Sequence, residues 1–162
     1  MSFRNYRFII PVWFLLFILV GGGGVFTTGC SKGQVKLSET EQQIQKVDAF
    51  LSALQEVYAK KDLVTLKTHF SPEFQVQHPE LFRAIQRTFD RTDELRMELT
   101  VDVIHKDGQK VKVLLHWDVN AKAAKSSLQQ RGNTTLQLFE KETLQVVALE
   151  GDNPFVLDGV LP

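Results

Sequence analysis

Residues 95–119 read LRMELTVDVIHKDGQKVKVLLHWDV, and this stretch decides the fold. Apolar and polar side chains alternate over its first nine residues, and the alternation returns from Lys110 to Val119. Successive side chains of a strand point to opposite faces of a sheet, so a period of two predicts a half-buried strand. We therefore expect two strands here, joined as an antiparallel hairpin with one apolar face.

The register of this hairpin is predicted from its two faces. A two-residue turn at Asp107-Gly108 would set apolar residues of one strand against polar residues of the other. A three-residue loop, Lys106 to Gly108 with Gly108 in the left-handed conformation, pairs like with like. The expected apolar pairs are Val103–Val111, Val101–Val113, Leu99–Leu115 and Met97–Trp117, and the expected polar pairs are Asp102–Lys112, Glu98–His116 and Arg96–Asp118.

The residues before the hairpin have helical periodicity. Ser38-Glu39-Thr40-Glu41 has the spacing of a capping box, and apolar residues beginning with Ile44 then recur at steps of three and four. Three helices are predicted, over about residues 39–60, 62–70 and 79 to 90–92. The second should stop before Pro72, because the residue before a proline is pushed out of the helical region. Phe74 is expected to pin the loop that follows.

Two further strands are predicted after the hairpin, over residues 128–141 and 144–150. Residues 120–127 are polar with several Lys and Ala, which favours a connection that is either irregular or a splayed strand end. The apolar residues expected to share a face in these strands are Leu136, Leu138, Leu144 and Val146. Three helices followed by four antiparallel strands predict an α+β fold, with the helices packed on one face of a bent sheet.

The composition is that of one globular domain with a leader. Of the 162 residues, 43% are hydrophobic and 23% charged, so a core can form without disulfides or a metal. Two of the 19 basic residues, Arg4 and Arg7, lie in the first 29 residues, which leaves 17 basic against 19 acidic side chains in the rest. This balance leaves no excess of positive charge with which to bind phosphates, so no nucleic-acid partner is expected.

The first 29 residues have the anatomy of a secretory signal peptide. Arg4 and Arg7 precede an apolar run that starts at Phe8 and meets four glycines at residues 21–24. As a helix, the run before the glycines spans about 20 Å, less than the hydrocarbon core of about 30 Å. An uncleaved membrane anchor stays open as the alternative, because nothing from Phe8 to Ser31 is charged.

The single cysteine, Cys30, stands where the apolar run meets the polar chain, directly after Thr27-Thr28-Gly29. This junction resembles the lipobox of bacterial lipoproteins, although that pattern most often has Leu where Thr27 stands. The resemblance implies a signal peptide over residues 1–29, a lipid anchor at Cys30 and a tether over residues 30–37. A thioether-linked diacylglycerol with an N-terminal acyl chain would hold the protein stably on the membrane. Ser31 resembles the sorting signal for the outer membrane, with the domain in the periplasm.

Residues 38–156 resemble the nuclear transport factor 2-like superfamily, whose SnoaL- and cystatin-like α+β domains form a cone. The segments that carry the likeness are Phe50–Leu54, Tyr58–Leu63 with Leu66 and Phe70, and Leu144–Val146. The resemblance implies a curved sheet wrapped around the long first helix, with residues 157–162 as a C-terminal tail. The superfamily includes isomerases, dehydratases and many noncatalytic proteins, so the fold does not settle the function.

Few residues are candidates for a site inside such a cone. Catalytic members place carboxylates, Tyr, His or Arg in an apolar cavity, where desolvation tunes the pKa for proton transfer. The inward face of the first two predicted strands instead consists of Leu, Met, Val and Trp. The residues that could line a cavity or its rim are Tyr58, His69, His78 and Trp117. From the third strand, either Gln130 with Thr134 or Arg131 with Asn133 could point inward.

The four histidines have no metal-ligand spacing, and no motif names a reaction. The sequence therefore predicts no catalytic residue, no metal site and no cofactor. It favours a noncatalytic, lipid-anchored domain that binds an apolar small ligand or another envelope protein. A small isomerase or dehydratase that uses the cone cavity is the alternative.

Overall fold

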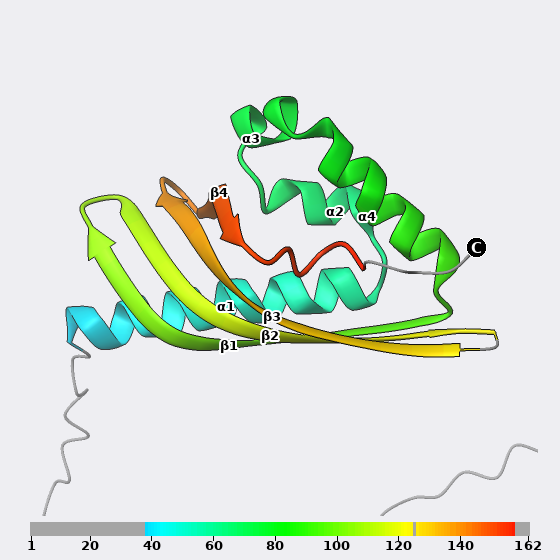
Figure 1. Ribbon diagram of the computed structural model, residues 1–162. Coiled ribbons are helices and arrows are strands. Elements are labelled where there is room, and N and C mark those ends of the chain that lie inside the picture. The colour runs from blue at the N-terminus through cyan, green and yellow to red at the C-terminus, as the bar shows by residue number, and fades with distance from the viewer. Residues whose placement is uncertain (1–37, 125, 158–162) are drawn as a thin grey trace, which may run out of the picture. The chain divides into compact units, whose positions relative to one another are not determined.

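The structure, a computed structural model, describes residues 38–124 and 126–157. Within these residues the chain forms four helices and then a four-stranded antiparallel sheet, and the helices lie on the concave side of the sheet (Figure 1). The α+β fold class predicted from the alternation and the helical periodicity is confirmed. None of the described helices is both long and apolar enough to cross a bilayer.

The long helix α1, Glu39–Ala59, starts at the predicted capping box. The Ser38 side chain accepts the backbone N–H of Glu41 at 3.2 Å, and the Glu41 carboxylate accepts the backbone N–H of Ser38 at 2.7 Å. The helix buries a stripe of side chains against the sheet and the other helices; its buried members are Gln43, Val47, Phe50, Leu51, Leu54 and Tyr58. Ile44, expected on the same stripe, lies outside it and is 43% exposed.

Three shorter helices follow: α2, Leu63–Thr68; α3, Pro72–Gln77; and α4, Pro79–Arg91. The expectation of a loop around Phe74 is wrong, because α3 occupies that place. Ser71 accepts the backbone N–H of Phe74 at 3.1 Å, and Pro72 is the first residue of the helix. Helix α2 has already ended at Thr68, and the Ser-Pro pair that was expected to stop it instead starts α3, since proline suits the first helical turn.

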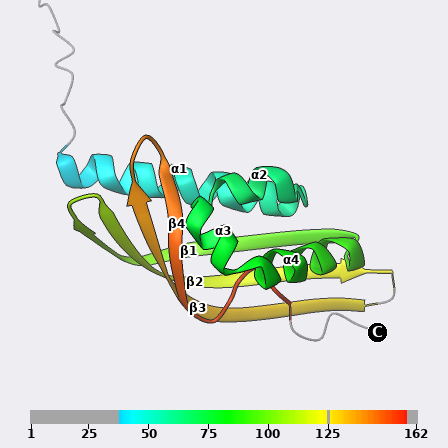
Figure 2. The ribbon, with the colours of Figure 1, turned by 90° about the horizontal axis from the view of Figure 1, so that it is seen from above.

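The sheet has the order β1-β2-β3-β4, with every neighbouring pair antiparallel. Its strands are β1, Glu94–Asp107; β2, Lys110–Ala123; β3, Ser126–Glu140; and β4, Leu144–Gly151. The residues Leu136, Leu138, Leu144 and Val146 are all buried on one face, as predicted. Seen from above, α1 runs beside β1 and α4 lies over the middle strands (Figure 2).

Residues 120–123 and 126–127 belong to the ends of β2 and β3, so the expectation of a strand end is confirmed, while the expected irregularity and splaying are wrong. Strands β2 and β3 stay paired to their ends, where Ala123 lies opposite Ser126. Ala121 pairs with Leu128 in this region and is buried. The small apolar side chain thus extends the inner face of the sheet past the point where the sequence becomes mainly polar.

The predicted register of the first hairpin is also wrong, by two residues before Asp102 and by three residues between Asp102 and the turn. Asp107 pairs with Lys110, so the loop is the two-residue Gly108-Gln109, with Gly108 at φ +58°. A β-bulge between Val101 and Val103 makes Asp102 an extra residue. The prediction assumed an uninterrupted strand, in which a two-residue turn would set apolar residues against polar ones. The bulge adds one residue to β1 and so shifts its alternation, and apolar residues can then pair across a two-residue turn.

The bulge changes which residues share a face. Before the bulge, apolar residues lie opposite apolar residues, as predicted, but the partners differ from those predicted. The observed pairs are Met97–Val119, Leu99–Trp117 and Val101–Leu115. After it, Ile104 turns inward, while Val103 turns outward and is 55% exposed. The predicted polar pairs are absent: His116 lies opposite Thr100, Glu98 opposite Asp118, Arg96 opposite Asn120 and Lys112 opposite His105.

Candidate functional site

The concave side of the sheet is packed with aromatic side chains. Phe70 lies at the centre, with ring centroids 5.3 Å from Phe74, 5.3 Å from Phe82 and 5.5 Å from Phe155. Offset and edge-to-face contacts at such distances are favourable and leave little room between rings. Among the described residues, the buried polar side chains apart from Tyr58 are Gln43, Ser71, Thr88, Thr92 and Thr134. None of these five is ionisable.

Tyr58, one of the four predicted cavity residues, lies in this core with no exposed surface. Its hydroxyl donates a hydrogen bond to the carbonyl oxygen of Phe155 at 3.2 Å, and its ring packs edge-on against Phe89 and Phe155. Burial raises the pKa of Tyr58 well above its ordinary value near 10. The phenol therefore stays protonated and ties α1 to the segment after β4.

The two candidate histidines lie at helix ends. His69 caps α2 and is half-buried, with its Nδ1 3.1 Å from the carbonyl oxygen of Thr65 and its ring against Phe50. His78 is exposed between α3 and α4, and its ring lies 4.4 Å from that of Phe74. Both rings therefore cover aromatic side chains at the surface.

Trp117, the fourth candidate, is 5% exposed and lies over Gly132 on the neighbouring strand. A Cβ on Gly132 would come within 2.6 Å of Trp117 Cζ2, so only glycine permits this contact. The indole Nε1 has no hydrogen-bond partner among the described residues. Trp117 lines an opening of about 790 Å³ under α4, together with Leu81, Ala84, Arg87, Gln130 and Asn153.

The structure distinguishes the two alternatives for the inward-pointing residues of β3. Thr134 is buried, and its hydroxyl donates to the carbonyl oxygen of Glu150 at 2.9 Å. Arg131 points to the other face, where its guanidinium bonds Asp118 at 2.6 Å. Gln130 and Thr134 therefore face the helices. Trp117 and Gln130 share the opening under α4, whereas Tyr58, His69, His78 and Thr134 lie outside it, so the predicted residues do not converge on one site.

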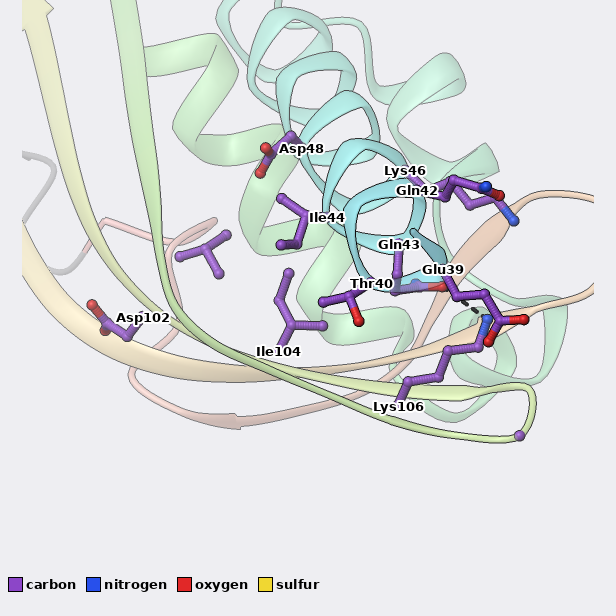
Figure 3. A pocket seen from close by; sticks show the side chains of 12 residues that line it. Glu39, Thr40, Gln42, Gln43, Ile44, Lys46, Asp48, Asp102, Ile104 and Lys106 are labelled. Carbon is purple, nitrogen blue, oxygen red and sulfur yellow. Dashed lines mark hydrogen bonds between the residues drawn. The ribbon is translucent and has the colours of Figure 1, made fainter. Parts of the chain in front are cut away.

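A different feature, which the sequence did not indicate, is a groove between α1 and β1. We call this the α1–β1 groove; its volume is about 960 Å³. The residues that line it are Glu39, Thr40, Gln42, Gln43, Ile44, Lys46 and Asp48 from α1, and Val101, Asp102, Ile104, Lys106 and Gly108 from β1 and its turn. Ile44 and Ile104 face each other across it (Figure 3). The signal missed in the sequence is the break in alternation at Val103-Ile104.

One end of the groove is closed by a network of ion pairs. Glu140 on β3 accepts from Lys46 at 2.5 Å and from Lys106 at 2.8 Å. The hydrogen bonds from Lys106 and then Lys46 lower the pKa of the Glu140 carboxyl below its ordinary value. Lys106 also donates to Gln43 Oε1 at 2.8 Å, which holds the hairpin end of β1 to α1.

Several predicted features lie outside the described residues: Cys30, the signal peptide, the tether up to residue 37 and the tail from residue 158. Within residues 38–124 and 126–157, no three His, Asp or Glu side chains are grouped so that they could hold a metal ion.

Comparison with known proteins gives matches in structure alone. No protein-family model matches the chain, and no curated protein matches its sequence. Among solved structures, a proposed dehydratase of the NTF2-like family from Streptomyces avermitilis has 12% identity and a TM-score of 0.58, over 68% of this chain and 94% of that one. An NTF2-like superfamily protein from Salmonella enterica serovar Typhimurium has 17% identity and a TM-score of 0.58, over 71% and 93%.

The protein Aln2 from a Streptomyces species has 14% identity and a TM-score of 0.59, over 72% of this chain and 94% of that one. At such identities the likeness concerns the backbone and not the site. The chain has the nuclear transport factor 2-like fold, as its helices and curved antiparallel sheet indicated. Proteins of this fold include ligand-binding proteins, isomerases and dehydratases, so the function must be argued from the residues of this chain.

Proposed function

We propose that this protein is a lipid-anchored protein of the bacterial envelope whose domain binds a partner without catalysing a reaction. The noncatalytic role is supported by the kind of polar residues that are buried in the domain. Among the described residues no carboxylate, histidine, lysine or arginine is buried against the concave face. Proton transfer in an apolar cavity needs such a group, because burial is what tunes its pKa to the task.

The isomerase or dehydratase alternative has less support in this chain. The opening beside Trp117 is lined by two acids, Glu80 and Asp152, and both are exposed. Exposed carboxylates are solvated by water and lack the apolar surroundings in which the catalytic acid or base of such an enzyme works. Tyr58, the buried ionisable group of the core, is held protonated by its burial and its bond to Phe155.

The anchoring part of the proposal is supported by the sequence at the junction of leader and domain. An apolar run after two arginines ends in Thr28-Gly29-Cys30, and the chain has no second cysteine with which Cys30 could form a disulfide. Lipid chains on Cys30 would place the domain next to the membrane, facing the periplasm, with the outer membrane favoured by Ser31. An apolar small ligand or another envelope protein would then reach it there.

The anchor is tested by labelling bacteria that express the full chain with a radioactive fatty acid. The parent chain should be labelled, shortened by the leader and recovered with the membranes. Cys30→Ala should lose the label and keep the leader, because the thiol that carries the lipid is gone. Ser31→Ala is the matched control and should be labelled like the parent. Labelling of Cys30→Ala equal to that of the parent, or an unlabelled parent that keeps its leader in the membrane, would contradict the anchor.

A further inference from the structure

We propose that the α1–β1 groove binds an extended, basic segment of a partner protein, which pairs with the free edge of β1. This inference rests on the proposed binding role and names the class of partner. It concerns a surface away from the opening beside Trp117. Four features of the groove carry it: a free strand edge, an apolar floor, a buried amide with unused donors, and unpaired acids.

Strand β1 lies at the edge of the sheet, with β2 on one side and no strand on the other among the described residues. At Leu99, α1 closes this edge, because the Gln55 side chain accepts the backbone N–H of Leu99 at 3.0 Å. The segment that lines the groove, Val101–Lys106, has no such cover among the described residues. An edge of this kind offers backbone N–H and C=O groups to an added strand.

The floor of the groove is apolar and partly exposed. Ile44 on α1 is 43% exposed, and Val101 and Ile104 on β1 are half-buried. The side chains of an added strand would alternate, so every second one would point down onto this floor. β-Branched or other apolar residues at alternate positions are therefore the expected pattern of the partner segment.

Gln43 supplies a polar contact at the hairpin end of the groove. Its side chain is 7% exposed, and its Nε2 has no hydrogen-bond partner, while its Oε1 accepts from Lys106. A buried amide group without a partner is destabilising, because the loss of its hydrogen bonds to water is not compensated. The Lys106 side chain that donates to the Gln43 Oε1 is itself 42% exposed, so this end of the groove is open to solvent. A carbonyl oxygen of the partner segment would then satisfy the unused donor.

The charges around the groove favour a basic segment. Both lysines that line it, Lys46 and Lys106, are bonded to Glu140. Glu39 and Asp48 have no ion-pair partner among the described residues, and Asp102 faces solvent beside His116 at 3.0 Å. The groove therefore has an excess of carboxylates, and lysine or arginine side chains on the upper face of the segment would complement them.

The test uses the full chain in micelles of a neutral detergent and a synthetic peptide of alternating Lys and Val as the probe. Its affinity is measured by titration calorimetry. A peptide of the same length with Glu in place of Lys should bind at least about tenfold more weakly, because its charges repel the groove. A Lys-Val peptide N-methylated at alternate residues should bind more weakly by a similar factor, because it lacks backbone N–H donors for strand pairing. Equal affinity of the three peptides would overturn the proposal.

The site is tested with Ile44→Gln, which removes apolar floor without adding charge. It should weaken binding of the Lys-Val peptide at least about tenfold. Val64→Gln on α2 is the matched control, since Val64 is 79% exposed and lies outside the groove. Equal binding of the peptide by the parent and by Ile44→Gln would overturn the proposal. Self-association of the full chain that Ile44→Gln abolishes would also overturn it, because the groove would then bind a second copy of the chain. Either result would leave the labelling of Cys30 unchanged, so failure of the groove and failure of the anchor are distinguishable.

Discussion

At the scale of the residue, Tyr58 and Gln43 show two ways in which this domain treats a buried polar group. Tyr58 is fully buried and its hydroxyl is bonded to the Phe155 carbonyl. Gln43 is almost as buried, yet one of its two polar atoms is unpaired. Native interiors leave few polar atoms without partners, and each exception calls for an explanation. Tyr58 holds the core together, whereas Gln43 lies at the surface where we propose that a partner binds.

Tyr58→Phe tests the structural role of the hydroxyl. The variant keeps the ring but leaves the Phe155 carbonyl unpaired, so the free energy of unfolding should fall by about 1 kcal/mol, measured by urea denaturation at pH 7.

The same variant should also change the pH dependence of stability. Because burial raises the pKa of Tyr58, its contribution is fully present below its unfolded pKa near 10 and is lost as the pH rises above it. Parent and variant should show parallel stabilities up to pH 9. Between pH 10 and 11 the parent should lose more stability than Tyr58→Phe. Equal losses in this range would show that Tyr58 is not buried as described.

At the scale of the element, the bulge in β1 and the glycine in β3 decide what the sheet presents. The bulge at Asp102 turns Ile104 toward α1 and Val103 toward solvent, which creates one wall of the α1–β1 groove. Gly132 lets the indole of Trp117 lie against the backbone of β3. Glycine inside a strand often marks such a close approach of another group.

Gly132→Ala should lower the free energy of unfolding by about 1–3 kcal/mol, which is the usual cost of overpacking a core. The added Cβ would meet Trp117 Cζ2 at 2.6 Å and the Asp152 Cβ at 2.7 Å, so either the indole or the segment after β4 must move. Thermal and urea unfolding measure the loss, and the near-ultraviolet dichroism of the indole reports the movement.

Gly108→Asn is the control for this substitution. Gly108 lies in the turn between β1 and β2, where a Cβ has nothing within 4 Å and Asn tolerates the positive φ. The control should change stability by no more than about 0.5 kcal/mol. A loss for Gly132→Ala as small as that of the control would contradict the contact with Trp117.

At the scale of the whole molecule, the folded unit spans Lys36–Pro162. The described core starts at Val47 on α1 and ends at Leu157 after β4, so the buried side chains all come from this unit. In the proposed arrangement, the first 29 residues direct export, Cys30 carries the anchor and the unit binds its partner.

A chain that starts at Lys36 should therefore fold by itself. It should unfold in one cooperative transition, at the same urea concentration as the full chain, because none of the described core contacts is removed. A broad, noncooperative transition would mean that residues before Lys36 contribute to the core. The full chain in neutral detergent serves as the reference.

Local signals in the sequence predicted most of the elements. The capping box at Ser38 and Pro79 at the first position of α4 act through neighbouring backbone groups, so their positions could be read directly. The alternation in β2 likewise predicted which of its side chains face the core. Helix α3 was missed because Ser71-Pro72 was read as the end of one helix and not also as the start of the next.

The candidate site could be predicted less well, for a physical reason. The fold class and the apolar inner faces of β2 and of β1 as far as Val101 followed from the sequence alone, because periodicity and spacing are properties of neighbouring residues. The anchor at Cys30 lies outside the described residues and stays a prediction. Only the tertiary structure decided the bulge at Asp102, the exposure of Ile44 and the unpaired amide of Gln43. These depend on where α1 diverges from the edge of β1, and that is settled by packing between elements far apart in the chain.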